Sequence, residues 1–301
     1  MSNDLFAALE SSTTSEIEEI PTSSYWKDAA SRLKANPLAV GACYLLALLF
    51  IMAIFAPLFS SHSYYETHLE LKNQPPSKTF WFGTDELGRD IFTRCWWGAR
   101  ISLFVGISAS FIDLCLGVLY GASAALASAR LAEWMMRIAD ILSSIPYLLV
   151  VILLMMLFGS GITSILLALT ITGWINMARI VRGQVLQTKQ CDFVMAAKAC
   201  GASKKRILFQ HLIPNAMAPI IVTLTLTIPS AIFAEAFLSF LGLGVQAPIA
   251  SWGTMANDGL PALKYYPWRL FFPAILISIT MLSFNILGDA LRDAFDPRMR
   301  R

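Results

Sequence analysis

The stretch "ILSSIPYLLVVILLMMLFGSGITSILLALTITGWINMA", Ile141–Ala178, contains no Lys, Arg, Asp or Glu. A helix of about 20 predominantly apolar residues crosses a bilayer, so this run is too long for a single crossing. Gly159, Ser160 and Gly161 offer a turn near its middle. The stretch therefore predicts two membrane-spanning helices joined by a short loop.

The same absence of charge recurs along the chain of 301 residues, in Ala35–Tyr65, Leu212–Ala234 and Leu270–Gly288. Only 14% of the residues are charged, whereas soluble domains average about 25%. A soluble protein with buried helices would show shorter runs of about 10–14 residues. The sequence thus predicts an all-α polytopic membrane protein. Its six expected spans are roughly Leu38–Phe59, Ser102–Ala127, Met136–Phe158, Ile162–Ile180, Ala216–Phe237 and Leu270–Gly288.

The basic residues predict the orientation of these spans, because cytoplasmic loops are enriched in Lys and Arg. With the N-terminus inside, 16 of the 23 Lys and Arg residues fall on the inner side. Both termini are therefore expected in the cytoplasm. Residues 1–25 are polar and acidic and lack the basic start of a secretory signal, so we expect a flexible cytoplasmic tail. Residues 291–301 are expected to form a second cytoplasmic tail.

Two segments between spans are long, and both fall on the expected outer side. Ser60–Arg100 predicts an interfacial amphipathic helix that starts at Thr84 as N-cap and runs to the end of the segment. Asp90 and Arg94 stand four residues apart on its polar face. Ser239–Leu263, which is rich in Gly and Pro, predicts a re-entrant or cap-like loop.

The polar segment between the fourth and fifth spans predicts two short helices with a tight bend. Asp192 can cap the first helix, and Gly201 is its expected end because glycine takes the left-handed C′ conformation without strain. Ser203 can cap the second helix, Lys204–Ile213. Pro214 follows and cannot donate a backbone hydrogen bond. The bend would lie at the inner membrane surface.

The surface of this segment leaves two interpretations open. Ala196 and Ala197 are small and permit another chain to approach closely. Lys204, Lys205 and Arg206 stand at a helix start, where the helix dipole disfavours cations, so anionic lipid or an acidic partner is expected nearby. A plain basic inner loop that follows the charge rule explains the same residues.

The spacing resembles the "EAA" loop of importer-type ABC permeases, which reads E-A-A, then Gly six positions after the Glu, then a closing I-x-L-P. Met195 stands where the family has Glu, and His211 and Ile213 replace Ile and Leu. The resemblance implies that residues 187–214 form the loop that couples to an ATP-binding subunit. The residues assigned to this coupling are Met195, Ala196, Ala197, Gly201, Ser203, His211 and Pro214.

Three further stretches are similar to the C-type permease subunit of peptide and nickel ABC importers (OppC/DppC-like). They are "FGTDELGRDIFTRCWWGARISL" (Phe82–Leu103), "RIADILSSIP" (Arg137–Pro146) and "AEAFLSFLGLGVQAPIASWGTM" (Ala234–Met255). The resemblance implies a type I ABC importer permease fold. The permease domain would occupy 98–290, after a first membrane helix with its cytoplasmic lead-in (26–60) and an extracytoplasmic loop with the interfacial helix (61–97).

The resemblance implies half of the translocation path of an ATP-driven importer for oligopeptides or dipeptides, in a bacterial inner membrane. Expected partners are a homologous permease subunit, two ATP-binding subunits, an extracytoplasmic solute-binding protein and the lipid bilayer, with no nucleic acid. The sequence contains no GxxxxGK[ST] loop for phosphates, so we expect ATP to bind to partner subunits and no cofactor, metal or catalytic residue in this chain. A nickel or small-solute importer, a stand-alone secondary transporter and an intramembrane enzyme are the alternatives.

Ionisable residues inside spans are expensive and are candidates for function. Asp113 lies near the middle of the second span. It could line the path, form a structural hydrogen bond to a neighbouring helix, or be a neutral carboxyl that burial keeps protonated. Glu235, near the outer end of the fifth span, could orient the outer loop or line the outer mouth. Arg137 and Asp140 are three residues apart, which favours a local ion pair.

Overall fold

The computed structural model describes residues 25–296, and within this range the chain is helical with one isolated β-bridge, between Thr84 and Asp90. The expected N-terminal tail, apart from Tyr25, and residues 297–301 of the expected C-terminal tail lie outside the described residues. The helices are α1 (Tyr25–Ala35), α2 (Pro37–Phe59), α3 (Ile91–Leu126), α4 (Ala129–Ser144), α5 (Tyr147–Phe158), α6 (Ile162–Thr188), α7 (Asp192–Ala199), α8 (Lys204–Ile207), α9 (Ile213–Phe240), α10 (Trp252–Gly259) and α11 (Trp268–Phe295).

The helices confirm the polytopic membrane architecture. Five of the described helices, with α8 and α9 taken as one, are long and apolar enough to cross a membrane, and the bent pair α4–α5 can supply a sixth crossing. The expected third span is therefore wrong as a single helix, because its two halves meet at 80°. Pro146 explains the break: it lacks an N–H and disfavours the helical conformation of Ile145 before it. The Gly159–Gly161 turn then connects α5 to α6 as expected.

The start of α3 differs from the sequence prediction. Its N-cap is Asp90, whose Oδ2 accepts a hydrogen bond from Thr93 N at 2.9 Å, and the helix continues without interruption to Leu126. The helix expected from Thr84 to Arg100 is thus the first part of the spanning helix, preceded by a tight loop. Arg94 lies near Asp85 (Nε to Oδ2, 3.5 Å), and both Asp90 and Arg94 are buried, so they do not form the polar face that the sequence predicts for this segment.

Glycines bring α3 and α6 into close contact. A Cβ on Gly117 would lie 2.5 Å from Met177 Cβ, and one on Gly121 would overlap with the carbonyl oxygen of Ala178. Small residues of this kind let helix backbones approach closely inside membranes, where van der Waals packing is a main source of helix association. Helices α3 and α6 are therefore closely packed along this part of the bundle.

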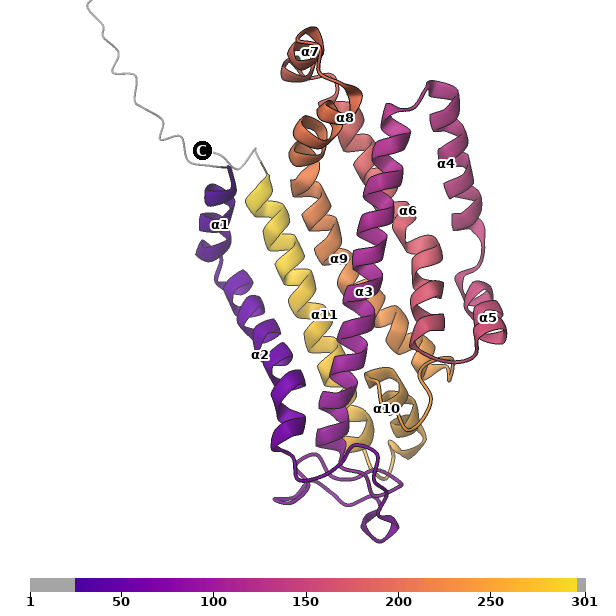
Figure 1. Cartoon of the computed structure of the whole chain (residues 1–301). Helices are drawn as coiled ribbons and strands as arrows, with labels where there is room; N and C mark the ends of the chain where they lie inside the picture. The colour runs from indigo at the N-terminus through magenta and orange to yellow at the C-terminus, as the bar shows by residue number, and fades with distance from the viewer. Residues whose placement is uncertain (1–24, 297–301) are drawn as a thin grey trace, which may run out of the picture.

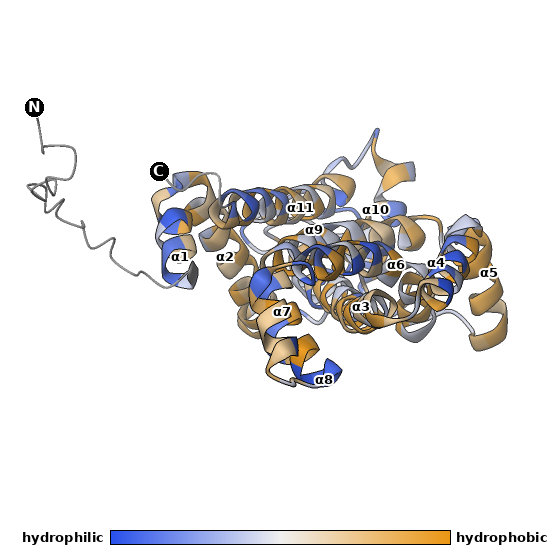
Figure 2. Ribbon diagram, turned by 90° about the horizontal axis from the view of Figure 1, so that it is seen from above, coloured by the Kyte–Doolittle hydropathy of each residue, from blue (hydrophilic) through white to orange (hydrophobic). Residues whose placement is uncertain are grey.

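Figure 1 shows that the short elements gather at two opposite ends of the bundle. We call the end with α7, α8, α1 and the last residues of α11 the hairpin end, and the end with α10 and the loop before α3 the cap end. Helix α11 runs to Phe295, so the C-terminal tail expected from residue 291 begins as helix instead. Viewed from above, α2 and α5 are hydrophobic over most of their length, whereas α1 carries hydrophilic residues (Figure 2).

Candidate functional site

The α7–α8 hairpin projects from the bundle at the hairpin end (Figure 1). Helix α7 ends at Ala199, and Gly201 follows it in the C′ position with a left-handed φ of 79°, as expected. Gly201 N donates to Lys198 O at 2.9 Å, and Ala202 N donates to Ala197 O at 3.0 Å. These two bonds form a Schellman motif, which satisfies carbonyl groups that a helix end leaves free. The bend is therefore held by backbone geometry.

The second half of the hairpin starts as the sequence predicts but does not end there. Ser203 Oγ accepts from Arg206 N at 3.3 Å and caps α8. A π-helical turn over Leu208–Leu212 then leads directly into α9, and Pro214 lies in the first turn of α9. The expected helix end at Ile213 is wrong, because the helix continues through the π-helical turn into α9 with Pro214 inside it.

A few buried apolar side chains fix the hairpin to the bundle. Val194 of α7, Ile207 of α8 and Leu212 are almost completely buried, in one cluster with Val181 and Val185 of α6. Asp192 is the first helical residue of α7, and the expected cap at this position is instead Cys191, without a side-chain hydrogen bond. The hairpin is thus packed onto the ends of α6 and α9 and can transmit a displacement to them.

The residues assigned to coupling are distributed around an open surface. Ala197 and His211 are half-buried. The others are exposed, namely Met195, Ala196, Gly201, Ser203 and Pro214. Met195 is 53% exposed, and a Cβ placed on Gly201 would meet nothing within 4 Å in the described chain. The hairpin therefore presents small and apolar groups outward at this end.

At the cap end, Glu235 lies completely buried among hydroxyl groups. Ser102 donates to Glu235 Oε2 and Ser239 donates to Oε1, both at 2.7 Å. Ser102 Oγ in turn accepts from Trp252 N at 3.3 Å, at the start of α10. Glu235 therefore joins α3, α9 and α10. Of its two expected roles, this arrangement favours orienting the outer loop, and it disfavours lining the outer mouth.

The cap itself is close-packed. Helix α10 begins with a capping box of Ser251 and Thr254, and the Trp252 indole donates to Cys95 O at 2.9 Å. A Cβ on Gly253 would overlap with the carbonyl oxygen of Ala236. The expected cap-like loop is thus a short helix clamped between α3 and α9.

Asp113 is a buried residue of α3, and its carboxylate lies against Gly173 of α6. A Cβ at position 173 would overlap with the carboxylate, so only glycine leaves room for it. Asp113 Oδ1 has no hydrogen-bond partner among the described residues. The expected structural hydrogen bond to a neighbouring helix is therefore not found in this part of the chain, and the path-lining role stays a prediction.

Ion pairs at the hairpin end differ from the sequence prediction. Asp140 of α4 accepts from Arg179 of α6 at 2.6 Å, and Arg137 lies 3.5 Å from Glu133. The expected pair of Arg137 and Asp140 is thus wrong. Arg137 pairs with Glu133, which is four residues away along α4, a spacing that brings side chains together. Asp140 pairs with Arg179, which lies on α6 and comes near only when the helices pack.

The sequence matches two family descriptions. Residues 117–301 match "Binding-protein-dependent transport system inner membrane component", and residues 24–76 match "N-terminal TM domain of oligopeptide transport permease C". The chain is 59% identical to the oligopeptide transport system permease protein OppC of Bacillus subtilis, over 92% of this chain and 91% of that protein. The chain belongs to the family of binding-protein-dependent inner membrane transport components.

Other members of the family agree with this assignment. This permease is 58% identical to the dipeptide transport system permease protein DppC of Bacillus subtilis, over 93% of this chain and 88% of that protein. It is 40% identical to OppC of Escherichia coli K12, over 95% of each chain. The permease is thus a multi-pass protein of the inner membrane.

Solved structures confirm the fold. A structure of the MetNI methionine ABC transporter in inward-facing conformations matches with a TM-score of 0.57 at 18% identity, covering 66% of this chain and 94% of that chain. The crystal structure of an amino acid ABC transporter matches with a TM-score of 0.51. The permease therefore has the helical fold of ABC importer permeases, as its sequence motifs imply.

Proposed function

We propose that this permease imports short peptides and forms half of a translocation path that ATP-binding subunits drive. The identity of 58–59% to oligopeptide and dipeptide permeases of Bacillus subtilis is the observation that carries the peptide assignment. The remaining subunits would be a homologous permease, two ATP-binding subunits and an extracytoplasmic solute-binding protein. The hairpin end would face the cytoplasm.

The α7–α8 hairpin would be the contact to the ATP-binding subunit. Three of its features support this role: a bend held by the Gly201 Schellman motif, a buried anchor at Val194, and an open outer surface at Met195 and Ala196. A rigid bend with a fixed base can convert a push on α7 into movement of α6 and α9. The exposed cations of α8 would meet anionic lipid or an acidic surface.

The proposal is tested with the complex reconstituted in vesicles with its solute-binding protein. Ala196→Glu places a charge on the outer surface of the hairpin, and Ala30→Glu makes the same change at an exposed position of α1, at the same end of the bundle. We expect Ala196→Glu to reduce peptide uptake and substrate-stimulated ATP hydrolysis, and Ala30→Glu to leave both unchanged. Gly201→Asp and Ala197→Glu should act like Ala196→Glu.

Wild-type uptake in the Ala196→Glu, Ala197→Glu and Gly201→Asp complexes would refute the docking role. Uptake that proceeds without ATP would favour a stand-alone secondary transporter. Uptake of a nickel salt or amino acids, with no uptake of di- to pentapeptides, would refute the peptide assignment while leaving the importer intact.

A further inference from the structure

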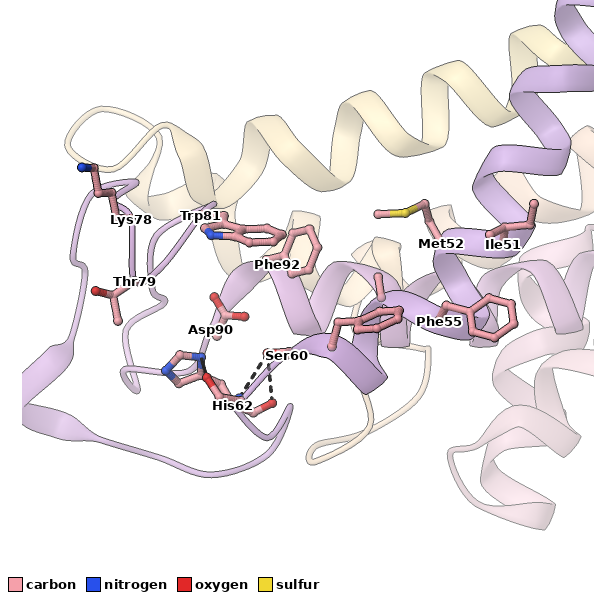
Figure 3. Close-up of a pocket in the computed structure, with 13 residues that line it drawn as sticks. Ile51, Met52, Phe55, Ser60, His62, Lys78, Thr79, Trp81, Asp90 and Phe92 are labelled. Atoms are coloured by element: carbon pink, nitrogen blue, oxygen red, sulfur yellow. Dashed lines mark hydrogen bonds between the residues drawn. The ribbon is translucent and has the colours of Figure 1, made fainter.

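A cavity of about 720 Å³ lies at the cap end of α2. Figure 3 shows how α2, the loop after it and the start of α3 enclose it. One end is lined by apolar side chains of α2, including Ile51, Met52 and Phe55. The volume is typical of sites for small molecules, which are mostly apolar with a few polar groups.

The other end of the cavity is polar and contains an unsatisfied carboxylate. Asp90 is only 4% exposed, and its Oδ2 accepts from both Thr93 N and the Thr93 hydroxyl. Its Oδ1 has no hydrogen-bond partner among the described residues, and no cation of the described chain lies within ion-pair distance. Buried carboxylates are normally paired or hydrogen-bonded. The cavity thus has one acceptor without a donor.

The neighbouring hydroxyl groups cannot provide that donor. Ser60 Oγ lies 2.6 Å from Thr93 Oγ1. Because the Thr93 hydroxyl donates to Asp90, Ser60 must donate to Thr93, and Ser60 Oγ itself accepts from His62 N at 3.1 Å. Every proton of this chain of hydroxyls is therefore committed. A further donor for Asp90 has to come from outside the described residues.

A cation stands at the same polar end. Lys78 lines the cavity from the exposed loop and forms no ion pair with the described residues. In Figure 3 it lies at the opposite end from Ile51 and Met52, beyond Trp81. The polar end thus offers one unpaired positive group and one unsatisfied negative group.

The apolar end opens on the exposed, apolar face of a spanning helix. Ile51 and Phe55 are 53% and 48% exposed on α2, which carries no charged residue. From Ile51 to Phe59 the helix rises by about 12 Å at 1.5 Å per residue. One leaflet contributes about half of a hydrocarbon core of about 30 Å. The cavity therefore has the depth and polarity of one lipid in the leaflet at this end.

We propose that the cavity binds a glycerophospholipid whose headgroup carries a phosphate and a primary ammonium, as in phosphatidylethanolamine. An acyl chain lies along Ile51, Met52 and Phe55. The phosphate pairs with Lys78, and the ammonium donates to Asp90. A choline headgroup cannot replace it, because its quaternary nitrogen has no proton to donate.

The test uses the full chain purified with its co-purifying subunits, in nanodiscs with equal amounts of phosphatidylethanolamine, phosphatidylcholine and phosphatidylglycerol. After detergent extraction, native mass spectrometry counts the lipids retained on this subunit. Lys78→Gln removes the cation, and Lys72→Gln is the control on the same exposed loop. Ile51→Trp fills the apolar end, and Leu48→Trp is the control at a position that is also 53% exposed. Asp90→Asn keeps an oxygen for the α3 cap and removes the charge.

We expect phosphatidylethanolamine to be retained in preference to phosphatidylcholine. Its retention should fall by about tenfold or more in Lys78→Gln and in Asp90→Asn, because losing one hydrogen bond to a charged group lowers affinity by about that factor. Ile51→Trp should lower retention of every lipid, and both controls should match the wild type. Equal retention of the three lipids, or unchanged retention in Lys78→Gln and Ile51→Trp, would overturn the proposal. Cross-linking of the cavity to another subunit, with no lipid retained, would overturn it as well.

Discussion

Replacing Gly201 with alanine tests whether backbone geometry holds the hairpin. An L-residue in the left-handed conformation costs about 1–2 kcal/mol. The added methyl group meets nothing within 4 Å in the described chain, so no clash adds to this cost. Alanine also reduces the freedom of the unfolded segment, which returns about 0.4–1 kcal/mol. The net destabilisation of α7 should be about 1 kcal/mol, or about fivefold in its opening equilibrium.

Gly183→Ala is the matched control, since Gly183 lies exposed within α6, has no left-handed φ and also has open space around its Cβ position. Alanine in a helix interior stabilises by about 0.5–1 kcal/mol relative to glycine. The same chemical change should therefore have opposite signs at the two positions. Gly201→Asn should fall between wild type and alanine, because asparagine tolerates the left-handed conformation.

Amide hydrogen exchange of the intact complex, read by mass spectrometry, measures these local openings. Peptides covering residues 192–203 should lose about fivefold of their protection in Gly201→Ala. Peptides covering residues 178–190 should keep or gain protection in Gly183→Ala. Unchanged exchange in Gly201→Ala, or equal losses in both variants, would refute the view that a left-handed glycine fixes the bend.

Three further predictions concern the packing of the bundle and are tested by thermal unfolding in detergent. Gly121→Ala should destabilise by about 1–3 kcal/mol through overpacking against α6, whereas Gly41→Ala, which meets nothing within 4 Å, should be neutral or stabilising; equal effects would contradict the close α3–α6 contact. Glu235→Ala should destabilise by about 3 kcal/mol, because it removes two hydrogen bonds to a buried carboxylate, and a melting temperature like that of the wild type would mean that the cap does not depend on it. A double-mutant cycle of Arg179 and Asp140 should give a coupling below about 1 kcal/mol, since both side chains are largely exposed; a larger value would show that the α4–α6 pair is shielded from water.

Local sequence signals predicted the structure where neighbouring residues decide it. The charge-free runs located the spans, and the Gly201 and Ser203 positions gave the bend and the cap of α8 within the hairpin. The bend and the cap depend on hydrogen bonds between residues that are three to five positions apart. The family motifs added the fold, which composition alone does not specify.

The predictions failed, or left alternatives open, where distant residues decide the structure. Thr84 is a good cap residue, but its hydroxyl donates to Leu71 O and its backbone pairs with Gln74, so α3 starts later. The role of Glu235 depends on Ser102, which is 133 residues away in the chain. The partner of Asp140 is on α6 for the same reason. Such partners are determined by how the helices pack, and a short stretch of sequence does not predict that packing.

The central claim is that the α7–α8 hairpin contacts the ATP-binding subunit, and site-specific photo-cross-linking in the assembled transporter tests it most directly. A photoreactive amino acid replaces Met195, which is 53% exposed at the hairpin end, or Leu241, which is 47% exposed near the cap end. We predict that the probe at position 195 attaches to the ATP-binding subunit and that the probe at position 241 never does. Attachment of the Met195 probe to the solute-binding protein or to this chain alone would contradict the account.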